Sequence, residues 1–312
     1  MLCHFAHLLR DEYGLTSSPQ VDIYKKVGMF LCILAHGKGY RQVTTIFNYS
    51  LQTVCQFFKE VLCVIVLLSE RIIRSAHDYN DGVEPHKPDP NKHPLFQDCI
   101  GAINETHVRA VLPRHKWVNF IGRKGIPTQD VLAACDFNLC FTFVLAGYTR
   151  NTHDARILAR AIYSPEIEFP QLATGKYYLV DSDFAHQPGY MAPYKGSDIL
   201  YHFQNVIKRA FGVLKQRSKI LDRMPSYSFP TQVAVVLATM AIHNFLRHLG
   251  VVDEAFARAE TDDNVAKVEL PNVEDEIQVE VNAPEIQWNE WDRLRNYMMM
   301  AVRIIAQISL VN

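Results

Sequence analysis

The chain has 312 residues, of which 48% are hydrophobic and 21% are charged, and its formal net charge is −1. This length can bury a full core as one large or two modest domains, and the composition is that of an ordinary soluble globular protein. Seven cysteines form no C-x-x-C pair and are odd in number, so they suggest neither a zinc ribbon nor a disulfide framework and favour a reducing compartment.

The beginning of the chain, MLCHFAHLLRDEYG, carries acidic residues and histidines and has no small-residue cleavage site, so we expect no signal peptide. The longest apolar run, residues 62–68, is too short to cross a bilayer, so we expect no membrane partner. Without secretion, the N-x-S/T sequons at Asn48 and Asn104 are expected to carry no glycan.

The charge is distributed unevenly. Residues 251–290 contain 12 acidic residues against Arg258 and Lys267, a net charge of −10 that leaves +9 for the rest of the chain. A basic body with an acidic segment is compatible with a nucleic-acid-binding core and a mobile or partner-binding tail. A solvated surface with a disordered loop explains the charge equally well.

Residues 1–76 have a helical pattern, with apolar residues at three- and four-residue steps over 27–34 and a Gly37/Gly39 pair that ends that helix. A short helix then meets a break at residues 48–50. Ser50 is the expected N-cap of a second helix.

This succession of a helix, a short turn and a helix can place the second helix in a DNA major groove, but any αα-hairpin shows the same pattern. The first turn of the second helix offers Gln52 and Thr53 but no arginine for reading bases. A helix-turn-helix and a structural hairpin therefore remain alternatives for residues 1–76.

Residues 77–95 contain four prolines and clustered Asp and Asn residues, which predicts a linker. After it, short apolar runs separated by turn residues alternate with amphipathic segments, and residues 136–138 read as a hairpin turn. We therefore expect an α/β domain with a mixed sheet and flanking helices over residues 96–250.

Two acidic residues lie at expected strand ends. Asp154 opens a helix just after a strand, and Asp181 ends the apolar strand 177–180. Acids gathered at adjacent strand ends can hold Mg²⁺ or Mn²⁺, because hard cations prefer carboxylate oxygens. Taken singly, Asp154 suits a helix N-cap and Asp181 suits a turn.

Six motifs carry a resemblance in their order along the chain: CIGAINETH, FIGRKG, LAACDFNLCFTFVLAGYTRNTHDARIL, YYLVDSDFAHQPGYMAPY, NVIKRAFGVLKQRSKIL and LATMAIHNFL. The series resembles the Harbinger-type transposase-derived nucleases, which include plant relatives domesticated as chromatin factors. The likeness covers nearly the whole chain, since residues 1–76 also resemble the helical segment that precedes that nuclease domain. It implies an RNase H-like fold with a DDE-type metal site that cuts and joins DNA.

The resemblance also assigns site positions. The family's first acid, in G-A-I-D-G/C-T-H, falls on Asn104, and its second matches Asp154 in THDARIL. A further metal-contacting acid matches Asp181, and the glutamate of V-I-E-R falls on Lys208. The resemblance thus implies catalytic and metal-binding roles for Asp154 and Asp181, with the acids at positions 104 and 208 lost.

These losses change the charge of the expected site from −4 to −1, whereas two-metal catalysis needs carboxylates to hold two cations about 4 Å apart. We therefore expect Mg²⁺ or Mn²⁺ to bind weakly or not at all. The ammonium of Lys208 is expected beside Asp154 or Asp181, attracted by about 4 kcal/mol at an effective dielectric of 20. Glu105 cannot substitute because adjacent strand residues face opposite sides, and Asp198 lies in a segment shorter than the family's.

The resemblance and the losses predict a catalytically impaired protein of the nucleus, with the cytoplasm as a second location. Its expected partners are DNA, a Myb-like DNA-binding protein or a chromatin complex. The alternatives are a residual divalent-metal-dependent DNA endonuclease and a decayed element copy. Residues 251–287 are expected to be mobile, and residues 288–312 are expected to form a helix that docks on the core.

Overall fold

The computed structural model describes residues 1–75, 96, 98–121, 125–149, 154–167, 169–170, 172–193, 198–250 and 256. The expected linker 77–95 and the expected C-terminal helix 288–312 lie outside the described residues, and of the acidic segment 251–287 only Phe256 is described. The expectations for these three segments therefore stay predictions.

The chain begins with four helices, whose bounds are α1 Leu2–Asp11, α2 Ile23–His36, α3 Tyr40–Phe47 and α4 Leu51–Ile72. Helix α2 ends at Gly37, whose left-handed backbone (φ 62°) suits a residue without a Cβ atom. The hydroxyl of Ser50 accepts a hydrogen bond from the Thr53 amide at 3.1 Å and caps α4. Both predicted helix boundaries are confirmed.

A five-stranded mixed sheet follows, with strands β1 Cys99–Arg109, β2 Thr128–Cys135, β3 Phe141–Tyr148, β4 Tyr177–Val180 and β5 Tyr190–Met191. The strand order is β3-β2-β1-β4-β5, in which β1, β2 and β3 pair antiparallel and β1, β4 and β5 pair parallel. The predicted α/β fold with a mixed RNase H-like sheet is confirmed, and the turn at 136–138 joins β2 to β3 as expected.

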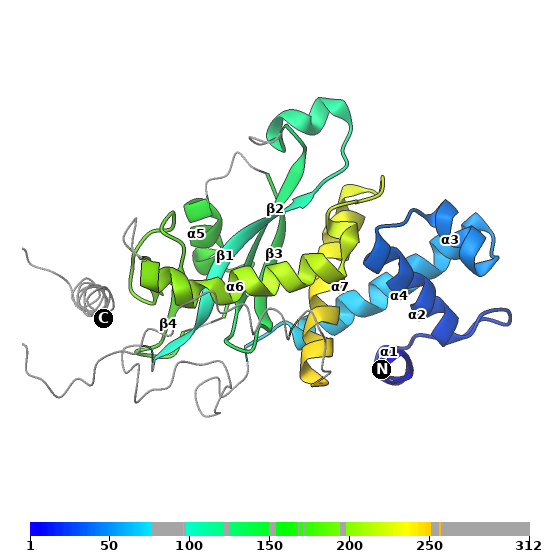
Figure 1. Ribbon diagram of the computed structural model, residues 1–312, viewed down its shortest axis with the longest axis horizontal. Helices are drawn as coiled ribbons and strands as arrows, with labels where there is room; N and C mark the ends of the chain where they lie inside the picture. Colours follow the sequence, from blue (N-terminus) through cyan, green and yellow to red (C-terminus); the bar gives the residue numbers. More distant parts are fainter. Residues whose placement is uncertain are drawn as a thin grey trace, which may run out of the picture.

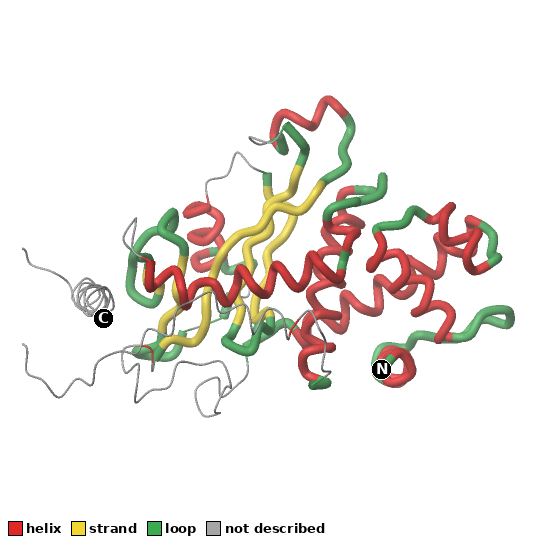
Figure 2. The backbone as a smooth tube through the Cα atoms, viewed as in Figure 1, coloured by secondary structure: helices red, strands yellow, loops and turns green. Residues whose placement is uncertain are grey.

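Three helices accompany the sheet: α5 Asp154–Tyr163, α6 Asp198–Arg217 and α7 Phe229–His248. Helix α6 crosses one face of the sheet (Figure 1 and Figure 2), where Val206, Ile207 and Ala210 join the larger core cluster. Helix α5 packs on the other face, where Ile157 and Leu158 join a second cluster. The sheet is thus a layer between helices, and each of its faces is buried by a different core.

Two buried side-chain amides of helix α7 form hydrogen bonds to the backbone near the sheet, one to a residue just after β1 and one to the first residue of β3. Gln232 accepts a hydrogen bond from the Val111 amide at 2.9 Å and donates to the Val111 carbonyl at 2.7 Å. Asn244 likewise accepts a hydrogen bond from the Phe141 amide at 2.8 Å and donates to the Phe141 carbonyl at 2.7 Å. It also donates to the Ile72 carbonyl at the end of α4. These amides satisfy backbone groups that would otherwise be buried without partners.

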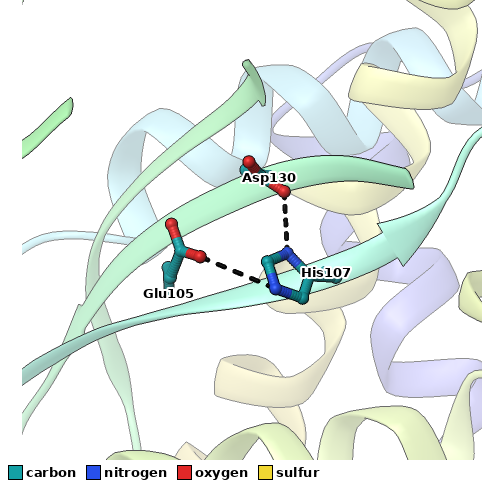
Figure 3. A group of neighbouring side chains, drawn as sticks. All are labelled: Glu105, His107 and Asp130. Carbon is teal, nitrogen blue, oxygen red and sulfur yellow. Dashed lines mark hydrogen bonds and ion pairs between the residues drawn. The ribbon is translucent and has the colours of Figure 1, made fainter. Parts of the chain in front are cut away.

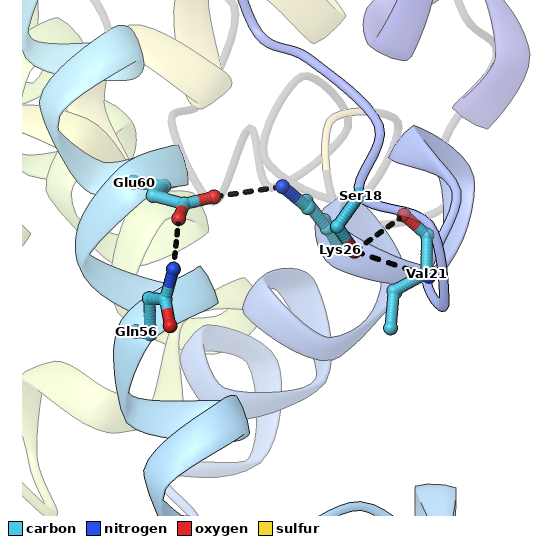
Figure 4. A network of polar contacts seen from close by, with 5 residues as sticks. All are labelled: Ser18, Val21, Lys26, Gln56 and Glu60. Atoms are coloured by element: carbon cyan, nitrogen blue, oxygen red, sulfur yellow. Dashed lines mark hydrogen bonds and ion pairs between the residues drawn. The ribbon is translucent and has the colours of Figure 1, made fainter.

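The N-terminal helices and the sheet share one continuous core. Helix α4 packs against α7, and Phe58 of α4 lies 5.3 Å, centroid to centroid, from Tyr227, which precedes α7. On α2, the Lys26 side chain is 3% exposed, and its ammonium binds Glu60 of α4 at 2.7 Å (Figure 4). The helical region is therefore docked on the α/β domain rather than separated from it.

By length and composition alone, α4 and α7 could each cross a membrane. In the structure, 39% of the most apolar stretch of α4 and 56% of that of α7 is buried within the fold. Both helices contribute buried side chains to the larger core cluster, including Val61 and Ile65 of α4 and Val235 and Val236 of α7.

Candidate functional site

The parallel pairing of β1 and β4 brings two of the predicted positions together. Ile103 pairs with Val180, so the next residue along each strand is Asn104 on β1 and Asp181 just after β4. The alternation of strand side chains puts position 104 on the same face as Ala102, toward the α6 core cluster.

Both side chains form local hydrogen bonds. Asn104 is 8% exposed, and its side-chain oxygen accepts a hydrogen bond from the Glu105 amide at 2.8 Å. The Asp181 carboxylate accepts hydrogen bonds from the Ser182 amide at 2.7 Å and the Ser182 hydroxyl at 3.3 Å. Asp181 therefore organises the turn that leaves β4 while presenting its second oxygen toward α6.

That second oxygen faces a cation. The ammonium of Lys208, on α6, lies 4.0 Å from Asp181 Oδ2. The two side chains are 43% and 23% exposed, so solvent screens the pair and its net contribution to stability is about 0–1 kcal/mol. Its importance is positional, because a positive charge lies beside the carboxylate that was expected to bind a metal ion.

The fourth predicted position lies on a different element. Asp154 begins α5, as expected, and α5 packs on the sheet face opposite to α6. The side chains of Asp154 and Asp198 are outside the described residues, so their distances to Asp181 remain untested. The structure thus brings Asn104, Asp181 and Lys208 together, and the convergence of Asp154 with them stays a prediction.

Glu105 faces away from Asn104, as the strand alternation predicted. It lies beside His107, two residues further along β1, and Asp130 of β2 lies directly opposite His107 in the antiparallel register. Figure 3 shows the three side chains converging on one face of the sheet. They form a carboxylate–imidazole–carboxylate group that the sequence interpretation missed.

The geometry of this group is compact. His107 Nδ1 lies 2.7 Å from Asp130 Oδ1, and His107 Nε2 lies 3.7 Å from Glu105 Oε1. One ligand atom from each residue lies within 4.8 Å of the others. The Asp130 side chain is 2% exposed, whereas that of His107 is 39% exposed and reaches the surface. Two sequence signals pointed to this group: the acid Asp130 near the start of an apolar strand, and the Glu-x-His pair of residues 105–107. They are far apart in the sequence, and only the register of β1 and β2 brings them together.

Comparison with known families gives two matches. Residues 105–244 match the family described as DDE superfamily endonuclease, and residues 1–67 match a family described as a domain of unknown function (DUF8040). The first match supports the DDE endonuclease superfamily for this part of the chain. Asn104 lies one residue before the matched range. No curated protein and no solved structure matches the chain significantly.

Proposed function

We propose that the chain is a Harbinger-type, transposase-derived protein whose DDE centre is catalytically impaired, and that it acts in the nucleus as a DNA-binding or chromatin-protein-binding factor. The observation that carries the proposal is the Lys208–Asp181 ion pair beside the neutral amide of Asn104.

The charge at these three positions explains the impairment. Asn104, Asp181 and Lys208 sum to zero, so a divalent cation there must displace an ammonium and gains a single carboxylate as its anionic ligand. Mg²⁺ gives up water reluctantly and is held by one or two carboxylates together with substrate phosphates. Two-metal phosphodiester chemistry requires more anionic ligands than these positions supply.

Charge also supports a binding role. The connection between β1 and β2, residues 110–127, contains no acidic residue and four cationic ones, Arg114, Lys116, Arg123 and Lys124. Its 3-10 helix η2, Arg114–Asn119, projects beyond the end of the sheet (Figure 1). Arginine and lysine on a projecting element suit contacts with DNA phosphates, which fix position without reading sequence.

A Myb-like DNA-binding protein or a chromatin complex is proposed as the partner that supplies sequence recognition. The first turn of α4, with Gln52 and Thr53, provides no arginine for base contacts, and the inner face of α4 is committed to the core through Phe57, Phe58 and Val61.

A residual Mg²⁺- or Mn²⁺-dependent endonuclease is the second candidate. It is favoured by the match of residues 105–244 to the DDE superfamily endonucleases and by the retained carboxylate of Asp181. In that case Asp181, and Asp154 if its side chain reaches the same place, would hold the metal.

The two candidates differ in one assay. Supercoiled plasmid is incubated with the full chain and Mg²⁺ or Mn²⁺, and binding of a labelled duplex is measured in parallel by fluorescence anisotropy. Our proposal predicts salt-dependent binding without metal, weakened in Lys116→Glu but not in the control Lys25→Glu on α2, and no cleavage. Cleavage that disappears in Asp181→Ala would establish the second candidate instead.

A further inference from the structure

We propose that Glu105, His107 and Asp130 form a binding site for a first-row divalent transition-metal cation, of which Zn²⁺ is the reference. Glu105 and His107 Nε2 would bind the cation directly, and Asp130 would position the imidazole through Nδ1. The site lies on the sheet face opposite to Asn104 and Lys208 and is independent of the proposed function.

The strand geometry builds this group without any loop. Glu105 and His107 are two residues apart on β1, so they share a face, and Asp130 pairs directly with His107 across the antiparallel register. Ligands on adjacent paired strands are held more firmly than ligands on loops. The three side chains are therefore pre-arranged by the backbone pairing.

The distances distinguish the two contacts of the imidazole. The 2.7 Å contact between Nδ1 and Asp130 is a hydrogen bond, and when Nδ1 donates to the carboxylate, Nε2 can bind a cation on the side of Glu105. The 3.7 Å between Nε2 and Glu105 Oε1 is too long for a hydrogen bond. It is close to the separation of about 3 to 3.7 Å expected for two atoms that bind one Zn²⁺ at ordinary bond lengths.

Charge and donor chemistry indicate the kind of cation. The Glu105 and Asp130 side chains are 11% and 2% exposed, so two carboxylates share a largely buried space with one imidazole. A dication bound here would be attracted by both carboxylates, because opposite charges attract more strongly where solvent is largely excluded. The imidazole nitrogen favours Zn²⁺ or Co²⁺ over Mg²⁺, Ca²⁺ and Mn²⁺, and the 39% exposure of His107 leaves an entry path from solvent.

The competing explanation is an imidazolium held between two carboxylates, with no metal. The test uses the full chain stripped with a chelator and titrated with Co²⁺, followed by visible absorption, and then with Zn²⁺ as competitor. We expect one equivalent of Co²⁺ to bind and Zn²⁺ to displace it. Glu105→Gln and His107→Gln should abolish this binding, and Asp130→Asn should weaken it about 10- to 100-fold.

Two controls separate the site from others. His115→Gln, on the exposed η2 helix, should bind Co²⁺ as the unmodified chain does. Asp181→Asn should also leave binding unchanged, because Asp181 lies with α6 on the other face. Binding lost in Asp181→Asn but kept in Glu105→Gln would overturn this proposal and favour the residual nuclease, so the two proposals fail in different ways.

Should the variants not fold, X-ray absorption of the Zn²⁺-loaded unmodified chain decides the question. We expect oxygen ligands and one imidazole nitrogen at about 2.0 to 2.2 Å. A sulfur shell would place the metal on cysteines such as the exposed Cys3 and Cys63, and it would overturn the proposal. Absence of stoichiometric Co²⁺ or Zn²⁺ binding would do the same and leave the imidazolium explanation.

Discussion

The ammonium of Lys208 lies 4.0 Å from the carboxylate of Asp181, at the point where β4 ends beside Asn104. In a DDE-type centre, the resemblance places acids at the positions of Asn104 and Lys208. The positive charge of Lys208 stabilises the carboxylate of Asp181 in the way that a bound metal cation would. In our proposal, a neutral amide at position 104 and a cation at position 208 therefore stand where the resemblance places acids.

The Lys26–Glu60 pair joins α2 to α4 (Figure 4). Removing the charge of Glu60 should destabilise the fold more than removing the charge of Lys26. Glu60→Gln is expected to cost about 1–3 kcal/mol of unfolding free energy at pH 7, because it leaves the ammonium of Lys26, whose side chain is 3% exposed, without its counter-charge. Lys26→Met should cost less, since the Glu60 side chain is 37% exposed and can be solvated. Urea denaturation of both variants measures the difference.

The same pair predicts a pH dependence. Burial acts to raise the pKa of Glu60, but the hydrogen bonds from Lys26 and Gln56 outweigh it, so the pKa lies below its ordinary value of 4.5. The stabilisation is fully present above pH 4.5 and is lost as the pH falls through the folded-state pKa. The cost of Glu60→Gln should therefore shrink between pH 7 and pH 4 or below. Equal costs for Glu60→Gln and Lys26→Met at pH 7 would contradict this account.

His243, buried on α7, should make the fold sensitive to mild acid. Burial lowers its pKa to about 3, and its Nε2 lies 2.8 Å from the Leu139 carbonyl. Because the unfolded chain binds a proton near pH 6.5 and the folded chain does not, stability falls by about 1.4 kcal/mol per pH unit below 6.5.

His243→Gln keeps a donor for Leu139 but does not titrate. Its stability deficit at pH 7.5 should therefore shrink by about 2 kcal/mol when measured at pH 5. His115→Gln, on the exposed η2 helix, should show no such change. A deficit of His243→Gln that is the same at both pH values would show that the imidazole is not kept neutral.

Asn244 should be among the most costly side chains to truncate, because its amide joins α7 to β3 and to the end of α4. Asn244→Ala removes three hydrogen bonds of 2.7 to 3.0 Å and leaves the buried backbone groups of Phe141 unpaired. We expect a loss of about 3 kcal/mol or more in unfolding free energy. Gln52→Ala, on the exposed first turn of α4, should change it by less than about 0.5 kcal/mol. A loss under 1 kcal/mol for Asn244→Ala would contradict this role.

Local signals predicted much of the fold. The strand Tyr177–Val180, the N-cap at Ser50 and the turn between β2 and β3 depend on patterns within a few residues, and all three are confirmed. The mixed sheet was predicted from the alternation of short apolar runs and amphipathic segments. The two-residue strand β5 was too short to give such a pattern.

The features that were missed depend on distant partners. The docking of the N-terminal helices on α7 uses Asn244 and Ile72, 172 positions apart, and no local pattern reports such a contact. The group around His107 depends on the register that places Asp130 opposite it, 23 positions away. The pairing of Lys208 with Asp181 was expected only because the family resemblance had assigned both positions to one site.

The central claim is that the charges at positions 104 and 208 prevent metal binding at the DDE centre. The most direct measurement is the melting temperature with and without millimolar Mg²⁺, a cation that an imidazole-containing site disfavours, for the unmodified chain, Asn104→Asp, Lys208→Glu and the double variant. Stabilisation by a bound ligand scales as RT ln(1 + [L]/Kd), so weak binding gives no shift. We predict a negligible shift for the unmodified chain, little for either single variant, and a clear rise for the double variant. A Mg²⁺-dependent rise in the unmodified chain that is lost in Asp181→Ala would contradict the claim.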